Sequence, residues 1–378
     1  DVSIGGRGAE QWLAELSRRV SRSPRNAGWA VTGDGAVEVT PAVPGVRLDV
    51  ARTVERLEKA AFSTGARTAQ VAVRTEEPAR TTDEAKAMGI REVVASYTTT
   101  YGGTPGRLHN VRLVSDLVDG ALVAPGATFS FNDVTGERNA SRGFQEAPVI
   151  INGELRNGIG GGVCQVSTTV YNAAFEAGLP IADRTNHALY ISHYPTGRDA
   201  TVNYPDLDLR FVNDTGGWML VRLFVGEGAL TVKLLGTSPK RRVETETEPV
   251  RIAGKMPFRV IRDPELTVGT RIREQIGSHP LSTSVVRRVF DADGKLLSER
   301  RFPSYYIGEP TIVRVGTRQP EPVAPAPVVP ELSAGEPEAA APAAPAAEPS
   351  DPPSAPVPVP APAVSELAPV AAPPTPRP

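Results

Sequence analysis

The sequence contains few cysteine, histidine and aromatic residues. Its 378 residues include one cysteine and four histidines, so no internal disulfide can form and few ligands are available for a transition metal. It has neither an HExxH motif nor a Gly-rich loop followed by Lys-Ser/Thr, the motifs of zinc proteases and nucleotide-binding proteins. The net charge of −2 lacks the basic excess of a nucleic-acid-binding protein. We therefore expect no metal site, no cofactor and no nucleic-acid partner.

Long apolar segments are also lacking. No run approaches 18 apolar residues, so the sequence predicts no transmembrane helix within these residues. The first residue is Asp1, and neither the basic region nor the apolar region of a signal peptide follows it. We expect a secretory signal or a membrane anchor upstream of residue 1.

The most distinctive stretch joins three glycines to the only cysteine. Gly160, Gly161 and Gly162 lead through one residue into Cys164. The following residues have the 3.6-residue periodicity of a helix that ends near Gly178. The positions on one helix face are Val166, Val170, Ala173 and Ala177, and those on another are Cys164, Thr168, Tyr171 and Phe175. The pattern therefore places Cys164 in the first turn of a helix.

This position favours a reactive thiolate. The unpaired N–H groups and the positive dipole end of a first helical turn lower the pKa of a cysteine. Glycines let a substrate backbone approach closely, and their amides can stabilise an oxyanion. A cysteine nucleophile for acyl transfer is one interpretation. The other is a buried cysteine that packs as a small apolar residue beside a tight turn.

An acyl-transfer site also needs a base and a residue that orients it. His187 and His193 follow Cys164 within thirty residues. They are an even number apart, so on the strand that we expect at 189–194 both would face one side. Asp199 is expected to orient the base or, alternatively, to pair with Arg198. Gln165 and the backbone amides of 162–164 are the expected oxyanion donors. Alternatively, His187 is a hydrogen-bonded core histidine.

Composition and pattern divide the chain into four segments, 1–90, 91–237, 238–318 and 319–378. The first two mix helical and strand patterns, and the third has short strand patterns with an Asp-Gly turn. The last holds twenty of the thirty-seven prolines and lacks aromatic residues, so it cannot bury a core and is expected to be disordered. The fold class is therefore a multidomain α+β protein with a disordered Pro/Ala-rich tail.

Several motifs of the second segment resemble those of the VanW domain. They are "PGATFSFN" at 125–132, "GGGVCQVSTT" at 160–169, "GRDATV" at 197–202, and Asn110 after the basic Arg107. The resemblance implies a central α+β domain at the cell wall and, as in some members, L,D-transpeptidase activity that uses the motif cysteine. It does not by itself imply vancomycin resistance, because the family extends beyond resistance clusters.

Carried over residue by residue, Cys164 matches the family's cysteine, His187 its histidine, and Arg198 and Asp199 its "GRD". The expected catalytic residues are Cys164, His187 and Asp199. The sequence departs from the pattern at His193, where relatives more often have Tyr. The residues expected to bind substrate are Gly160, Gly161, Gly162, Gln165, Thr168, Tyr171, Arg198 and Asn110.

The flanking segments resemble other cell-wall modules. Residues 1–90 are similar in layout to a peptidoglycan-binding domain, and residues 238–318 resemble a G5 domain. We expect an exported protein at the cell wall or the outer face of the cytoplasmic membrane, with peptidoglycan stem peptides and glycan as partners. The activity expected is cysteine-dependent cross-linking of stem peptides. The alternatives are a non-catalytic peptidoglycan-binding scaffold and an accessory protein of the vancomycin-resistance type.

Overall fold

The computed structural model describes residues 4–33, 35–65, 67–151 and 154–319. The described residues up to 319 belong to one compact unit. The Pro/Ala-rich tail that the sequence predicts falls outside the described residues from residue 320 onward. Within the described ranges, each helix is too short or too polar to cross a lipid bilayer.

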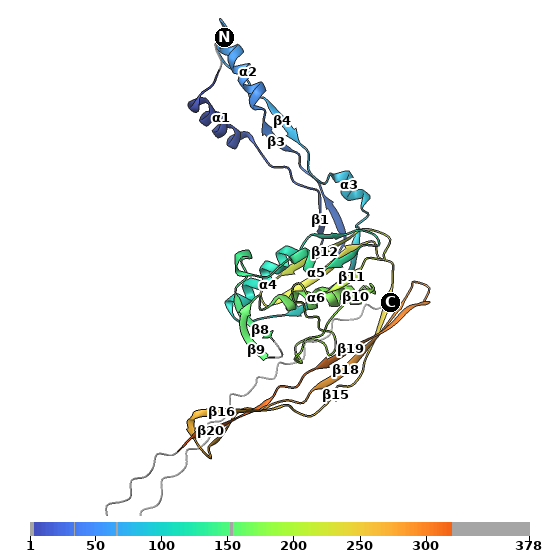
Figure 1. Ribbon diagram of the computed structural model, residues 1–378. Helices are drawn as coiled ribbons and strands as arrows, with labels where there is room; N and C mark the ends of the chain where they lie inside the picture. Colours follow the sequence, from blue (N-terminus) through green and yellow to red (C-terminus); the bar gives the residue numbers. More distant parts are fainter. Residues whose placement is uncertain (1–3, 34, 66, 152–153, 320–378) are drawn as a thin grey trace, which may run out of the picture. The chain divides into compact units, whose positions relative to one another are not determined.

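The N-terminal segment alternates helices with two-stranded ribbons (Figure 1). Asp49 caps the second helix, because its carboxylate accepts a hydrogen bond from the Arg52 amide. The strand that follows this helix begins at Val73, which pairs with Leu48 of the strand before the helix. The elements are α1 (Arg7–Val20), β1 (Gly28–Val31), β2 (Val37–Thr40), β3 (Gly45–Leu48), α2 (Val50–Ala61), β4 (Val73–Glu76) and α3 (Thr82–Ala87).

The central segment contains a four-stranded antiparallel sheet in the order β5-β13-β12-β6. A smaller sheet, β10-β11-β7, and a β8–β9 hairpin adjoin it. The elements are β5 (Glu92–Thr100), α4 (Pro105–Val118), β6 (Ala121–Val123), β7 (Thr128–Ser130), α5 (Phe131–Thr135), the 3-10 helix η1 (Ala140–Arg142), β8 (Glu146–Ile151), β9 (Glu154–Ile159), α6 (Val163–Glu176), β10 (Ile181–Asp183), β11 (Arg210–Val212), β12 (Met219–Val225) and β13 (Ala229–Gly236).

The four-stranded sheet has an apolar layer on each face. Along β12, Met219, Val221 and Leu223 enter the core that contains α6 and α4, whereas Leu220 enters a second cluster with Trp29 and Ile90. Successive side chains of a strand point to opposite faces, so alternate apolar residues of β12 serve two different cores. The N-terminal segment is thereby packed on one face of this sheet and the cysteine helix on the other.

Helix α6 begins one residue before Cys164, as predicted, but it is not amphipathic. Twelve of its fourteen residues are buried. The face with Thr168 and Tyr171, which the sequence suggests for substrate, is covered as well. Buried hydroxyl groups are tolerated there because Ser167 and Thr168 both donate hydrogen bonds to the Ala200 carbonyl. The helix is therefore a central support in which only Cys164 and Glu176 are not buried.

The C-terminal segment is built of β-ribbons. Strands β18 and β19 form its longest antiparallel pair (Figure 1). This ribbon reaches the central segment: Arg287 of β18 is 2% exposed and donates hydrogen bonds to the carbonyls of Phe175 and Leu179. The strands are β14 (Arg242–Thr247), β15 (Arg251–Ile252), β16 (Phe258–Thr267), β17 (Arg271–Gln275), β18 (Leu281–Phe290), β19 (Leu296–Tyr306) and β20 (Thr311–Arg318).

Candidate active site

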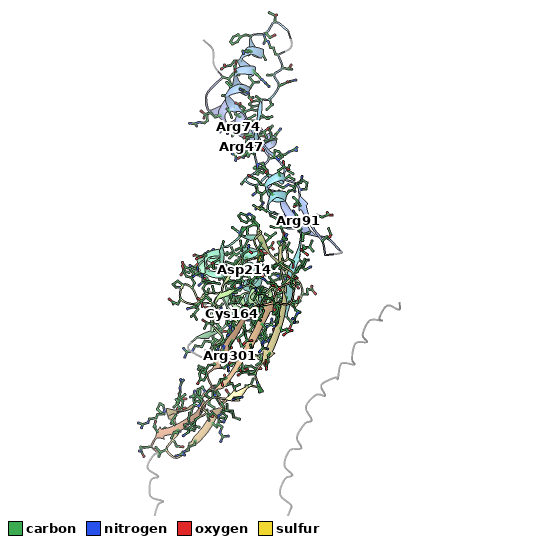
Figure 2. All side chains as sticks on the ribbon, turned by 90° about the vertical axis from the view of Figure 1, so that its right-hand side faces the viewer. Arg47, Arg74, Arg91, Cys164, Asp214 and Arg301 are labelled. Carbon is green, nitrogen blue, oxygen red and sulfur yellow. The ribbon has the colours of Figure 1, made fainter. Side chains whose placement is uncertain are left out.

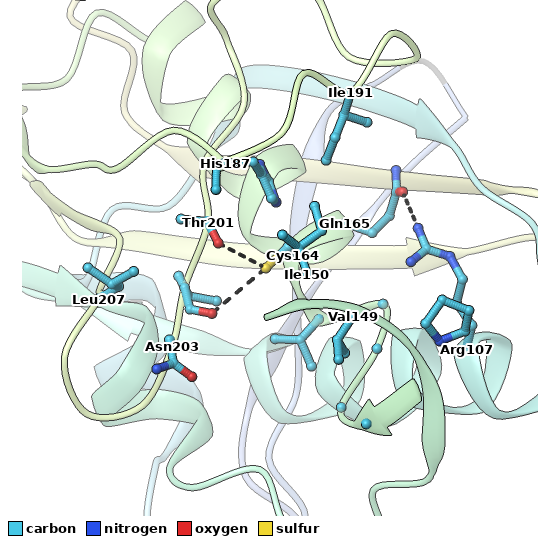
Figure 3. Close-up of a pocket in the computed structure, with 18 of the residues that line it drawn as sticks. Arg107, Val149, Ile150, Cys164, Gln165, His187, Ile191, Thr201, Asn203 and Leu207 are labelled. Atoms are coloured by element: carbon cyan, nitrogen blue, oxygen red, sulfur yellow. Dashed lines mark hydrogen bonds between the residues drawn. The ribbon is translucent and has the colours of Figure 1, made fainter. Parts of the chain in front are cut away.

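Cys164 lies in the central segment (Figure 2), at the floor of a pocket of about 1410 Å³. The pocket is larger than the roughly 300–1,000 Å³ typical of small-molecule sites, and a peptide fits that size better. Its walls come from the glycine loop before α6, the β8–β9 hairpin, the 185–204 segment and the end of β19. Val149 and Ile150 of β8 form an apolar side opposite His187 (Figure 3).

The glycine loop requires glycine for two reasons. Gly160 and Gly162 have φ angles of 90° and 109°, which side-chain-bearing residues rarely adopt. At Gly161 a Cβ atom would lie 2.5 Å from the Pro148 carbonyl oxygen, so the backbone there packs directly on β8. All three residues line the pocket. The sequence prediction of a side-chain-free approach to Cys164 matches this geometry.

Cys164 is partly buried and faces the 199–202 segment. Its Sγ atom lies 3.5 Å from Thr201 Oγ1 and 3.7 Å from the Val202 carbonyl oxygen (Figure 3). The sulfur is therefore held between the first turn of α6 and this segment, with one side open to the pocket.

His187 lies beside the sulfur (Figure 3) and is tied to Asp199. One carboxylate oxygen of Asp199 lies 2.7 Å from His187 Nδ1 and accepts a hydrogen bond of 2.6 Å from the His187 backbone amide. With Nδ1 on the carboxylate, Nε2 is the ring nitrogen left for Cys164. The structure thus joins the cysteine, histidine and aspartate in the order that a nucleophile, a base and an orienting residue require.

Asp199 is 3% exposed, and its other oxygen is also satisfied. That oxygen accepts hydrogen bonds from the Tyr306 hydroxyl at 2.8 Å and from Arg184 Nη2 at 3.2 Å. Arg184 also donates to the Gly197 and Pro303 carbonyls. A buried carboxylate with this many donors stays ionised and fixed in place.

The pKa values place opposite charges on the pair. Burial raises the pKa of the Cys164 thiol, but the hydrogen bond and attraction to His187 outweigh it and lower the pKa to about 7. Burial lowers the pKa of His187, but the hydrogen bonds to Asp199 and Cys164 raise it to about 9. Between these values the thiolate–imidazolium pair is the favoured state. The sequence attributed the low thiol pKa to the helix start, whereas His187 is its main cause.

Gln165 does not point a free amide into the pocket. It is 1% exposed, and its Nε2 donates to Thr99 Oγ1 at 2.7 Å. Its Oε1 accepts from Arg107 Nη2 at 3.1 Å (Figure 3). The Gln165 side chain therefore has no free N–H group with which to stabilise an oxyanion, contrary to the expectation from the sequence. The backbone amides of Gly162 and Cys164 are the remaining donors from the sequence prediction.

Four residues expected to bind substrate lie outside the pocket lining. Thr168 and Tyr171 are fully buried in α6. Arg198 donates to Asn172 and pairs with Glu176 at 2.6 Å, and thereby fastens the 198–202 segment to the helix. Asn110 donates to the Gly161 carbonyl at 2.9 Å, so it anchors the glycine loop from beneath. Each of them supports the pocket without lining it.

Of the other histidines, only His193 reaches the pocket. Residues 189–194 form a turn-rich loop and not the expected strand. His193 packs on Tyr194 with ring centroids 4.4 Å apart. Burial, Arg107 and His187 lower its pKa. His109 bonds to the Gly143 carbonyl, and His279 is exposed. His187 is therefore the histidine placed to act on Cys164.

The sequence patterns did not indicate Thr201, Tyr306, Arg184 or Arg138. Thr201 was available as the threonine of the "GRDATV" motif. No motif or periodicity marks the other three. Tyr306, for example, is 107 residues from Asp199, whose carboxylate accepts its hydrogen bond.

Comparison with known families matches two parts of the chain. Residues 106–235 match the model "VanW like protein". Residues 1–70 match the model "Putative peptidoglycan binding domain". The pocket residues from Arg107 to Leu207 thus fall within the first match.

Two curated proteins are similar in sequence. "Uncharacterized protein YoaR" of Bacillus subtilis (strain 168) is 32% identical over 225 residues, which cover 59% of this chain and 73% of that protein. The "Vancomycin B-type resistance protein VanW" of Enterococcus faecalis (strain ATCC 700802 / V583) is 29% identical over 114 residues, which cover 29% of this chain and 42% of that protein.

Two solved G5 domains are similar to part of the chain. The HP0197 G5 domain is 23% identical with a TM-score of 0.12, and covers 20% of this chain and 93% of that domain. The IgA1 protease G5 domain is 23% identical with a TM-score of 0.15, and the match covers 22% of this chain and 99% of that domain.

Proposed function

Because the chain belongs to the family of VanW-like proteins and carries a match to a peptidoglycan-binding domain, we propose that Cys164 catalyses acyl transfer on peptidoglycan stem peptides in the cell envelope. One observation carries the proposal. Cys164, with its pKa lowered to about 7, lies beside a histidine that a buried aspartate orients, in a pocket of peptide size.

The first half-reaction forms a thioester. The Cys164 thiolate adds to the carbonyl carbon of the third residue of a stem tetrapeptide, and the carbonyl electrons move to oxygen. The amides of Gly162 and Cys164 stabilise that oxyanion. When the oxyanion collapses, the bond to the terminal D-alanine breaks, and the His187 imidazolium gives its proton to the departing amine.

The second half-reaction releases the thioester. The amine of a neighbouring stem peptide attacks the thioester carbon while neutral His187 takes its proton, and the thiolate leaves. The product is a cross-link between two stems. Water in place of the amine gives a shortened peptide with a new carboxylate. Asp199 holds the imidazole in the tautomer that both steps need.

Intact-protein mass spectrometry tests the proposal. The full chain and its Cys164→Ala variant are incubated with a synthetic disaccharide-tetrapeptide. We expect the wild type alone to gain the mass of the acyl group, and added acceptor amine to convert it into cross-linked product. An unmodified wild type, shown to be folded by circular dichroism, would refute acyl transfer on this substrate.

The match of residues 1–70 favours a second function, that of a non-catalytic peptidoglycan-binding scaffold. This function predicts that the protein sediments with insoluble cell wall whether Cys164 is intact or replaced by alanine. It also predicts that Cys164 reacts with alkylating reagents no faster than a free thiol.

A further inference from the structure

Arg138 is the one pocket-lining arginine whose guanidinium has no hydrogen-bond partner among the described residues. Its Nε, Nη1 and Nη2 atoms are all buried, and each lacks a partner. The side chain lies on Phe131, with the guanidinium carbon 5.5 Å from the ring centroid. A buried cation without a partner is costly, and such groups are retained mainly where they serve a function.

Other buried arginines of the same unit show how unusual this is. Arg184, at 4% side-chain exposure, makes hydrogen bonds to Asp199 and to backbone carbonyls. Arg287 donates to two helix-end carbonyls. Arg107, on the wall of the same pocket, donates to Gln165 and to the Gly102 carbonyl. These arginines donate hydrogen bonds that connect parts of the fold, whereas the Arg138 guanidinium donates none to a described residue.

The position of Arg138 ties it to the reacting centre. It lines the same pocket as Cys164. A Cβ atom on Gly160 would lie 3.5 Å from the Arg138 Cβ, so the arginine adjoins the glycine loop. Burial lowers the pKa of Arg138, and among nearby charges Cys164 offsets this most. An anion bound at Arg138 would therefore lie in the pocket that Cys164 lines, beside the glycine loop.

We propose that Arg138 binds the C-terminal carboxylate of the substrate peptide, one residue beyond the bond that Cys164 cleaves. The proposal rests on the proposed acyl-transfer function and specifies its substrate. A guanidinium pairs with a carboxylate through two parallel hydrogen bonds. One residue spans about 3.5 Å, so a carboxylate on the departing residue lies close to the scissile carbonyl, whereas a carboxylate one residue further on lies beyond that reach.

The test compares two synthetic tetrapeptides that differ only at the C-terminus, a free carboxylate and a carboxamide. Acyl-enzyme formation is followed by intact mass for the wild type, Arg138→Gln, Arg138→Lys and Arg112→Gln. Arg112 is an exposed arginine of α4 outside the pocket and serves as the control. Binding of both peptides to Cys164→Ala and to Cys164→Ala/Arg138→Gln is measured by calorimetry.

We expect the wild type and Arg112→Gln to prefer the carboxylate about tenfold to a hundredfold, the range for a charge-assisted hydrogen-bonded pair. In Arg138→Gln the ratio falls to near one, through slower reaction of the carboxylate peptide only. Arg138→Lys keeps part of the preference, because it retains the charge without the planar fork. In the Cys164→Ala background the same preference should appear in the dissociation constants.

Two results would overturn the assignment while leaving acyl transfer intact. One is equal reaction of both peptides with the wild type. The other is an equal loss for both peptides in Arg138→Gln, which would place the guanidinium on the sulfur or the oxyanion. If no acyl-enzyme forms, acyl transfer fails as the function, and the calorimetry still decides whether Arg138 binds the carboxylate.

Discussion

Replacing His187 by glutamine tests the origin of the low thiol pKa. In the wild type the pKa of Cys164 is lowered to about 7, chiefly by His187. About half of the sulfur is then thiolate at pH 7. Without the imidazolium, burial is the dominant influence and the pKa should return at least to its ordinary value of 9.0. The thiolate fraction at pH 7 then falls to about one in a hundred, roughly 50-fold less.

The rate of alkylation falls by less than the thiolate fraction. A thiolate of higher pKa is a better nucleophile, with a Brønsted slope of about 0.4–0.5, so a rise of about two pKa units increases its intrinsic reactivity by roughly 6- to 10-fold. At pH 7 the His187→Gln variant should therefore react about 5- to 8-fold more slowly with iodoacetamide. Above about pH 8 the order should reverse, because the variant thiolate is the stronger nucleophile.

The assay is the pH dependence of the second-order rate constant between pH 5 and pH 10. His193→Gln is the matched control, since His193 lines the same pocket and, within the part of the chain that the structure describes, it is His187 that bonds to Asp199. Its profile should follow the wild type, with an inflection near pH 7. A wild-type inflection near pH 9, or identical profiles for the wild type and His187→Gln, would refute the ion pair.

Four further predictions concern stability and the glycine loop. Arg138→Met should raise the free energy of unfolding in urea by about 1 kcal/mol, because it removes an unpaired buried cation, and a decrease would contradict its lack of partners. Asn110→Ala should lower that free energy by about 2–4 kcal/mol, since it leaves the buried groups bonded to its side chain unsatisfied. Gly161→Ala should shift the loop and slow Cys164 alkylation at pH 7, because its Cβ would meet the Pro148 carbonyl at 2.5 Å, and an unchanged rate would show that the loop is not under this constraint. The pKa of Asp199 is lowered below its ordinary 3.8 mainly by His187, against burial, so its stabilisation is present above that pH and lost below it. The difference in unfolding free energy between the wild type and Asp199→Asn should therefore shrink as the pH falls below about 4, and a constant difference would refute this.

The buried charges of Asp199 and Arg138 differ in how the protein surrounds them. Asp199 is stabilised by donors from Arg184 and Tyr306, so its charge is balanced within the protein. The Arg138 guanidinium has no hydrogen-bond partner among the described residues. A protein that leaves one buried charge unpaired beside a nucleophile gives up stability at the place where substrate charge can compensate it. This is why the Arg138 substitution should increase stability and reduce selectivity together.

The sequence by itself determined the features that depend on neighbours a few residues apart. The start of α6 at Val163, the cap at Asp49 and the β12–β13 hairpin follow from glycine conformation, side-chain capping and apolar periodicity. Position relative to the helix was enough to select Cys164 as a candidate nucleophile, and the resemblance of the motifs pointed to His187 and Asp199.

Only the tertiary structure decided which groups meet. Residues 189–194 are a loop, so strand periodicity had no bearing on the two histidines. Thr168 and Tyr171 share a helix face with Cys164, but both are fully buried, because the 198–202 segment and the β18–β19 ribbon pack on α6. The Gln165 side chain is held by hydrogen bonds to Thr99 and Arg107. Tyr306 reaches Asp199 across 107 residues. Local sequence patterns indicate the backbone conformation of a segment and which of its faces is buried. Contacts between distant segments form when the chain closes around a shared core, and such contacts leave no periodic pattern in the sequence.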